Sequence, residues 1–158
     1  MRISRSHHAF LLGCSSLLTV SVLHAATLTW DHNADGTASD GSGTWLNANQ
    51  WVNGGSATWN NGTPDDAIIG SGGSGSTITL GAVSAGTVSI DNFSGTYTLS
   101  GTSLDQTGGI TVGSTAGAVT INSVISGVGG LTMAGAGTLI LSGANTYTGS
   151  TTVSAGTL

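Results

Sequence analysis

The stretch Gly135–Leu158, GAGTLILSGANTYTGSTTVSAGTL, contains two short strand patterns separated by turn residues. In Leu139-Ile140-Leu141 and in Thr151-Thr152-Val153, apolar or β-branched side chains stand at alternate positions. A period of two places one set of side chains on a buried face and the other in solvent, as in a half-buried β-strand. Because glycine, serine and asparagine separate these patterns at short intervals, the stretch has no room for a helix.

The same pattern continues upstream, beginning at about residue 76. Eight strand cores are predicted: Ile78-Thr79-Leu80, Val88-Ser89-Ile90, Tyr97-Thr98-Leu99, Ile110-Thr111-Val112, Val119-Thr120-Ile121, Leu131-Thr132-Met133, Leu139-Ile140-Leu141 and Thr151-Thr152-Val153. Short similar units at regular spacing are typical of repeat structures, in which each unit buries its apolar face only by stacking on its neighbours.

Two all-β architectures fit this pattern. In a right-handed parallel β-helix, or solenoid, two or three strands form one coil of about 20 residues, and successive coils stack roughly 4.8 Å apart. In a β-sandwich, the same strands would pair antiparallel through hairpins. Tight hairpins favour Asn-Gly or Asp-Gly turns, and neither dipeptide occurs after residue 76. The sequence therefore favours the solenoid and keeps the sandwich as the alternative.

The first 25 residues have the pattern of a secretory signal peptide. Arg2 and Arg5 precede an apolar run, Ala9–Leu23, and small residues follow at Ala25 and Ala26. This order of segments predicts export with cleavage after Ala25, and the run is too short to span a membrane. The alternative is a lipidation signal, because Leu11-Leu12-Gly13-Cys14 resembles a bacterial lipobox.

The composition of the exported part excludes one class of partner and one source of stability. Beyond residue 25 the chain has no lysine, arginine or cysteine, and its seven acidic residues are all aspartate. A surface without lysine or arginine cannot neutralise phosphates, so nucleic acid is not expected as a partner. The fold cannot rely on disulfide bonds and must be held by strand pairing and packing.

Residues 26–66 differ in composition from the rest of the chain, because they contain all four tryptophans and six of the asparagines. A solenoid must cover the unpaired backbone groups of its first coil, so this region is predicted to be an N-terminal cap. The alternative function is carbohydrate binding, since indole rings stack well on sugars. The candidate glycan-contacting residues are Trp45, Trp51 and Trp59.

One segment carries a candidate metal site. Asp31, Asn33 and Asp35, followed by Gly36, match the first half of a calcium-binding loop, in which hard oxygen ligands alternate along the chain. The twelfth position of such a loop supplies a bidentate glutamate, whereas this chain has Ser42. The match therefore predicts weak calcium binding at most, against the simpler interpretation of a solvated turn.

Neither a cofactor nor catalysis is predicted. The segment Gly70–Gly75 contains a G-x-G-x-x-G pattern, but a strand follows it where a dinucleotide site needs a helix N-terminus, so it is interpreted as a flexible loop. Asp65 and Asp66 are the only adjacent acids, and neighbouring residues of a strand point to opposite faces, which makes them a poor acid–base pair. The chain is therefore not expected to be an enzyme.

Residues 135–158 resemble the autotransporter-associated β-strand repeat, also called the passenger-associated transport repeat. The resemblance rests on its pattern of glycines, alternating apolar residues and an N-T-Y-T-G motif. The matching positions are Gly135, Gly137, Leu139, Leu141, Gly143, Asn145, Thr146, Tyr147, Thr148, Gly149, Thr151, Val153, Gly156 and Leu158.

This resemblance implies a passenger segment of an exported protein on the surface of a Gram-negative-type bacterium. The expected organisation is a signal peptide (1–25), a cap (26–66) and a repeat solenoid (67–158) that is incomplete at its C-terminus. The expected function is a structural stalk without catalysis, and the alternative is an adhesin-like carbohydrate-binding module. Expected partners are an outer-membrane barrel, in cis beyond residue 158 or in trans, surface glycans, and further copies of the chain associating through the open edge of the solenoid.

Overall fold

The computed structural model describes residues 25–113 and 117–158. The signal peptide predicted for residues 1–25 and the lipobox at Cys14 lie outside these residues, apart from Ala25. The described residues form strands and turns and contain no helix. Accordingly, they include no helix long and apolar enough to cross a membrane.

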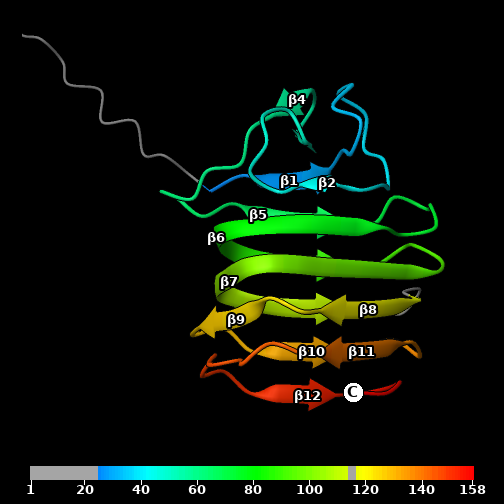
Figure 1. Ribbon diagram of the computed structural model, residues 1–158, viewed down its shortest axis with the longest axis vertical. Coiled ribbons are helices and arrows are strands. Elements are labelled where there is room, and N and C mark those ends of the chain that lie inside the picture. Colours follow the sequence, from blue (N-terminus) through cyan, green and yellow to red (C-terminus); the bar gives the residue numbers. More distant parts are fainter. Residues whose placement is uncertain (1–24, 114–116) are drawn as a thin grey trace, which may run out of the picture.

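The described part of the chain contains twelve strands (Figure 1). Their bounds are β1 Thr27–Trp30, β2 Gly43–Thr44, β3 Trp51–Val52, β4 Ser56–Ala57, β5 Asp66–Ile69, β6 Thr77–Ile90, β7 Thr96–Val112, β8 Ala118–Ile121, β9 Val124–Gly127, β10 Leu131–Met133, β11 Thr138–Leu141 and β12 Thr151–Val153. All eight predicted strand cores lie within these strands.

The strands form stacked parallel coils, where a coil is one full turn of the chain around the stack. One ladder runs from β5 through β6, β7 and β10 to β12, and every pairing in it is parallel. Its paired residues follow one another at intervals of 20 to 22 positions: Ala67, Val88, Ile110, Leu131 and Thr151. The predicted parallel solenoid is confirmed, and the β-sandwich is excluded because its strands would pair antiparallel.

Two long strands bend around the stack and contribute to three ladders each. The middle part of β6 pairs with the middle part of β7, which in turn pairs with β9. The aligned residues Val83, Leu104 and Ile125 of this third ladder are all buried. A register shift between Ala85 and Thr87 marks the corner at which β6 leaves this ladder for the next. None of the predicted strand cores lies in this third ladder.

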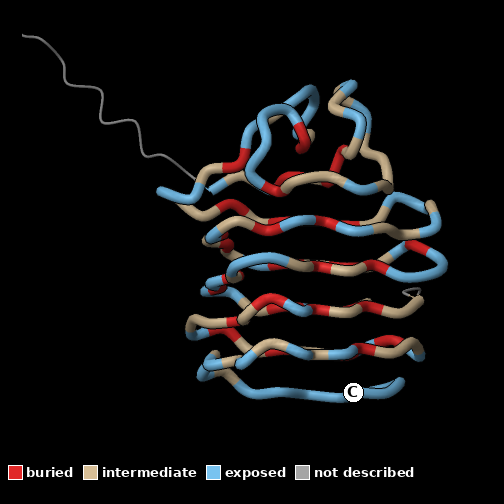
Figure 2. Tube along the Cα trace, in the orientation of Figure 1, coloured by how far each residue is buried: buried red, intermediate tan, exposed pale blue. Residues whose placement is uncertain are grey.

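The core lies inside the coils. Alternate residues of the long strands point inward, so that Ile78, Leu99 and Ile121 form one buried column from β6 through β7 to β8. Figure 2 shows buried residues recurring in successive coils and giving way to an exposed final segment. Residues 151–158 are exposed because, within the described residues, β12 pairs only with β10.

The N-terminal region closes the opposite end of the stack from β12 (Figure 1). Strand β1 continues the parallel ladder by pairing with β5, whereas β3 pairs antiparallel with both β1 and β4. This change of direction ends the parallel stack. The strands β1, β3 and β4, with the loops that join them, lie over the first coil as the expected cap does.

Candidate functional site

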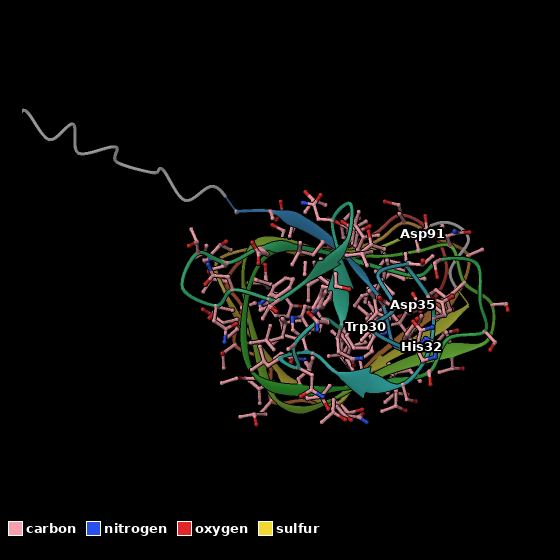
Figure 3. The ribbon with its side chains drawn as sticks, turned by 90° about the horizontal axis from the view of Figure 1, so that it is seen from above. Trp30, His32, Asp35 and Asp91 are labelled. Carbon is pink, nitrogen blue, oxygen red and sulfur yellow. The ribbon has the colours of Figure 1, made fainter. Side chains whose placement is uncertain are left out.

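The cap is built around four tryptophans that lie on or beside its short strands. Trp30 is on β1, Trp51 is on β3, and Trp45 and Trp59 follow β2 and β4. The ring of Trp51 is central: its centroid lies 5.2 Å from that of Trp30 and 4.8 Å from those of Trp45 and Trp59. These are favourable separations for edge-to-face and tilted aromatic pairs. Figure 3, a view down the stack, shows Trp30 in the middle of the cross-section.

Burial and hydrogen bonds assign these rings to packing. Trp45 and Trp51 have no exposed surface, and Trp59 is 6 % exposed. The Trp51 indole N–H donates to the carbonyl of Trp45 at 2.8 Å, and that of Trp30 donates to Gly41 at 3.0 Å. A sugar stacks on an open indole face, and these three rings offer none here. Glycan contact by Trp45, Trp51 and Trp59 stays a prediction, and their burial argues against it.

The segment after β4 covers the third ladder of the first complete coil. The Asn61 amide donates to the carbonyl of Ala82 at 2.8 Å, and its oxygen accepts from the backbone N–H of Ser84 at 2.9 Å. The Trp59 indole N–H donates to the Ser84 carbonyl at 3.1 Å. These side chains therefore replace the backbone partners that a preceding coil would supply to β6, which satisfies an otherwise open strand edge.

The oxygens of the candidate calcium ligands already accept hydrogen bonds within their own loop. Asp31 is fully buried and accepts from the backbone N–H of Gly36 at 2.9 Å and from the Ser39 hydroxyl at 3.1 Å. Asp35 accepts from the amide of Asn33 at 2.9 Å and from the backbone N–H of Thr37 at 2.8 Å. No group of three metal-binding side chains occurs among the described residues. Calcium binding here stays a prediction, and the contacts describe a self-contained polar turn.

The same loop brings a serine, a histidine and an aspartate together without making a catalytic triad. The Ser39 hydroxyl lies 2.9 Å from Nδ1 of His32 and 3.1 Å from Oδ1 of Asp31. In a triad the carboxylate holds the ring nitrogen that faces away from the serine. Here the carboxylate and the imidazole both contact the hydroxyl. Figure 3 shows His32 and Asp35 on the same side of Trp30, with Asp91 nearer the rim of the stack.

Asp40 makes a link between coils that the sequence pattern did not reveal. Its carboxylate accepts hydrogen bonds from the backbone N–H groups of Ser71, at 3.0 Å, and Gly73, at 2.5 Å. It also accepts from the Tyr97 hydroxyl at 2.6 Å. The G-x-G-x-x-G segment, interpreted above as a flexible loop, thus presents backbone donors to a carboxylate of its own chain. Backbone N–H groups that lie close together in a glycine-rich turn can form such an anion-binding concavity.

The Asp40 link predicts a dependence of stability on alkaline pH. Burial, followed by the hydrogen bond and charge of Asp40, raises the pKa of Tyr97 far above its usual value. The folded protein therefore keeps the phenol proton at a pH where the unfolded chain loses it, near pH 10 and above. The contribution is complete below about pH 10 and is lost as pH rises, by roughly 1.4 kcal/mol per pH unit.

We expect Tyr97→Phe to lower the free energy of unfolding by about 1.5–3 kcal/mol at pH 7, because a hydrogen bond to a charged group is lost. The variant should also lack the part of the alkaline decline that Tyr97 causes. Urea unfolding followed by circular dichroism at pH 7, 9, 10 and 11 measures both effects. The matched control is Tyr147→Phe, which removes a hydroxyl bonded to Thr151. An unchanged alkaline slope in Tyr97→Phe would contradict the assignment.

The adjacent acids Asp65 and Asp66 also serve the fold. Asp65 is buried and accepts from the backbone N–H groups of Ala26 and Asn60, at 2.8 and 2.9 Å. Asp66 accepts from the backbone N–H and the hydroxyl of Thr87, at 2.6 and 2.8 Å. The described residues also contain no pocket in which a small substrate could be enclosed.

The C-terminal stretch also makes hydrogen bonds to the coil before it. The Asn145 side chain accepts a hydrogen bond from the backbone N–H of Ile125, at 2.8 Å, in the coil before it. The backbone N–H groups of Thr146 and Thr148 donate to Ile125 and Gly127. The N-T-Y-T-G motif therefore continues the third ladder by one more coil, although it forms no regular strand there.

Comparison with known proteins agrees with this geometry. The Passenger-associated-transport-repeat family matches residues 131–158, which include β10, β11 and β12. The chain is also 37% identical over 156 residues to "Adhesin BmaC autotransporter" of Brucella suis biovar 1 (strain 1330). That similarity covers 93% of this chain and 4% of the relative, so the chain corresponds to a small part of that protein's length. No solved structure matches the chain.

Proposed function

The chain carries a passenger-associated transport repeat, and from this premise we propose that it forms a structural stalk segment of an exported bacterial surface protein. The observation that supports the proposal is the single parallel ladder that links β1 to β12 through every coil. Such a stack is quasi-one-dimensional, so each coil adds length and takes its stability from its neighbours. The solenoid, the repeat and the autotransporter relative together fit a structural passenger.

The proposed location is the outer surface of a Gram-negative-type bacterium. The relative is an autotransporter adhesin of Brucella suis. In this proposal, residues 1–25 direct export across the inner membrane, and an outer-membrane barrel, in cis or in trans, carries the passenger to the surface. Residues 26–66 then form the cap, and residues 67–158 form the repeat solenoid.

The relationship to a passenger repeat and an adhesin suggests a non-enzymatic role. We propose more specifically that these residues perform no catalysis. The support comes from six aspartates, Asp31, Asp35, Asp40, Asp65, Asp66 and Asp105, whose carboxylates all accept hydrogen bonds from groups of the chain itself. Carboxylates that already accept hydrogen bonds from their own chain are not free to transfer protons to a substrate.

The alternative function is an adhesin-like carbohydrate-binding module that uses the tryptophans of the cap. The relative's description as an adhesin is the observation in its favour, and the burial of the rings is the observation against it. A glycan array probed with the folded chain distinguishes the two. Binding that is lost in Trp59→Ala but kept by a stable variant elsewhere would support the alternative. Self-association through β12 likewise stays a prediction.

The stalk proposal is tested by linking folding of the coils to export. Ile110→Asn combined with Leu131→Asn places polar groups in one buried column, whereas Thr111→Asn combined with Thr132→Asn changes the outward residues of the same strands. Protease accessibility on intact cells of the native host measures the surface-exposed fraction. We expect the core pair to lose surface exposure and the outward pair to keep it, because folding outside the cell stabilises the exported state. Equal exposure of both variants would contradict folding-coupled export, and absence of the unmodified protein from the surface would contradict the stalk.

A further inference from the structure

The sequence contains two Asn-Gly dipeptides, Asn53-Gly54 and Asn61-Gly62, and the structure places them in opposite situations. An asparagine followed by glycine is chemically labile. The backbone nitrogen of the glycine can reach the side-chain amide carbon, since no Cβ hinders the approach. Whether the reaction occurs depends on the freedom of the amide to turn toward that nitrogen.

Asn53 has this freedom. It lies at the exposed tip of the β3–β4 hairpin, between Val52 and Ser56. Its side chain makes no hydrogen bond within the described residues, and the only contact of its backbone N–H is with the Gly55 carbonyl at 3.0 Å. A Cβ placed on Gly54, whose φ is +70°, would meet no atom within 4 Å. In Figure 1 this hairpin stands clear of the stack, beyond β1.

Asn61 lacks this freedom although it also lies at the surface. Its amide nitrogen donates to the Ala82 carbonyl, and its oxygen accepts from the Ser84 N–H and from the Trp59 indole at 3.2 Å. Turning this amide toward Gly62 would break all three hydrogen bonds and leave part of the β6 edge without partners.

We propose that Asn53 is a site of spontaneous self-modification, whereas Asn61 is protected. The Gly54 backbone nitrogen, after losing its proton to base, attacks the Asn53 side-chain carbon. A C–N bond forms, the C–N bond to the side-chain amide breaks, and ammonia leaves with a proton from water. Water then opens the cyclic imide at either carbonyl, which yields aspartate or isoaspartate at position 53. No enzyme or redox partner takes part.

The product adds one negative charge to a chain that has no lysine or arginine beyond Arg5. A Cβ placed on Gly54 or on Gly55 would meet no atom within 4 Å. The tip can therefore change its charge, or gain the extra backbone carbon of isoaspartate, without displacing Trp51. The modification is thus confined to the exposed end of the cap. This makes the hairpin a position at which the surface charge of the cap changes with the age of the protein.

The test is a time course of the purified full chain at pH 8 and 37 °C, with peptide mapping by mass spectrometry. Trypsin has no site beyond Arg5, so chymotrypsin, which cuts beside Trp51 and Trp59, separates the two asparagines. We expect conversion at Asn53 to be at least about tenfold faster than at Asn61, because three hydrogen bonds hold only the second amide. Gly54→Ala should slow the first site.

A denatured sample provides the structural control. In concentrated urea both dipeptides are unrestrained, so their rates should come within a small factor of each other, chiefly through faster reaction at Asn61. Equal rates in the folded protein, or faster conversion at Asn61, would overturn the proposal. A rate difference that persists in urea would also overturn it, because the cause would then be local sequence and not the Asn61 hydrogen bonds.

Discussion

Replacing Trp51 with alanine is expected to lower the free energy of unfolding by about 3–5 kcal/mol, as large-to-small changes of buried aromatic residues do. Trp51 is fully buried and is the only tryptophan whose ring contacts all three others. Its indole N–H also holds the carbonyl of Trp45. The variant therefore loses apolar burial, three aromatic contacts and one buried hydrogen bond. Urea unfolding followed by far-ultraviolet circular dichroism measures the change without relying on tryptophan fluorescence.

The matched control is Leu46→Ala. Leu46 lies beside Trp45 in the same region of the cap but is 38 % exposed, so its truncation should cost less than about 1 kcal/mol. Displacement of the cap in Trp51→Ala should also expose the end of the parallel ladder that the cap covers. This exposed edge should make the variant aggregate at a lower concentration than the unmodified chain. A loss of stability below about 1 kcal/mol in Trp51→Ala would show that the cluster is not what holds the cap on the stack.

The sequence predicted the regular part of the fold because that part obeys a local rule. Seven of the eight predicted strand cores have two inward positions around one outward position, as in Ile110-Thr111-Val112, and all eight lie in parallel ladders. Such patterns are read from three residues at a time. The length of a coil could also be predicted, since the spacing of the strand cores along the sequence sets the spacing of the paired residues.

The third ladder escaped prediction because its inward residues are not uniformly apolar. In β6 the inward positions are Val83 and Ala85, and in β7 they are Leu104 and Gln106. Gln106 is fully buried, and its amide donates to the Gly129 carbonyl at 2.8 Å. A polar residue at an inward position, such as Gln106, breaks the alternation of apolar and polar side chains. The bend between Ala85 and Thr87 does not end β6, so one strand continues from this ladder into the next.

The contacts of the cap could not be predicted, because they join residues far apart in the sequence. Asp40 and Tyr97 are 57 positions apart, and Asp40 and Gly73 are 33 positions apart. The sequence pattern assigned Asp40 no role, and the glycine-rich loop was interpreted as flexible. Only the stacking of three coils brings the carboxylate, the backbone donors and the phenol together.

Replacing Gly129 with alanine is expected to destabilise the protein by about 3 kcal/mol, the upper part of the usual range for overpacking. Gly129 lies between β9 and β10, where the chain turns a corner. A Cβ here would lie 2.3 Å from the backbone nitrogen of Gly109 and 1.8 Å from the side-chain oxygen of Gln106. The backbone nitrogen cannot move aside without separating two coils. Urea unfolding measures the loss, with Gly62→Ala as the control.

Gly62 is a suitable control because a Cβ there would meet only the side-chain oxygen of Asn60, at 3.3 Å, and no backbone of another coil, so its substitution should change stability by less than about 0.5 kcal/mol. The double variant Gln106→Ala/Gly129→Ala identifies the clashing atom. If the backbone of Gly109 is responsible, removing the glutamine side chain restores nothing. Recovery of stability in the double variant would contradict that cause and assign the clash to Gln106.

The position of Gly129 connects this prediction to the repeat. Gly109, Gly129 and Gly149 follow one another at intervals of one coil, and a Cβ on Gly149 would lie 2.4 Å from the backbone of Gly129 and Gly130. The coils therefore meet at this corner by direct backbone contact, which only glycine allows. Gly149 belongs to the N-T-Y-T-G motif, so the same contact fixes a residue of the repeat. Alanine at Gly149 should destabilise less than alanine at Gly129, because Gly149 has a described coil on one side only, whereas Gly129 is enclosed by two.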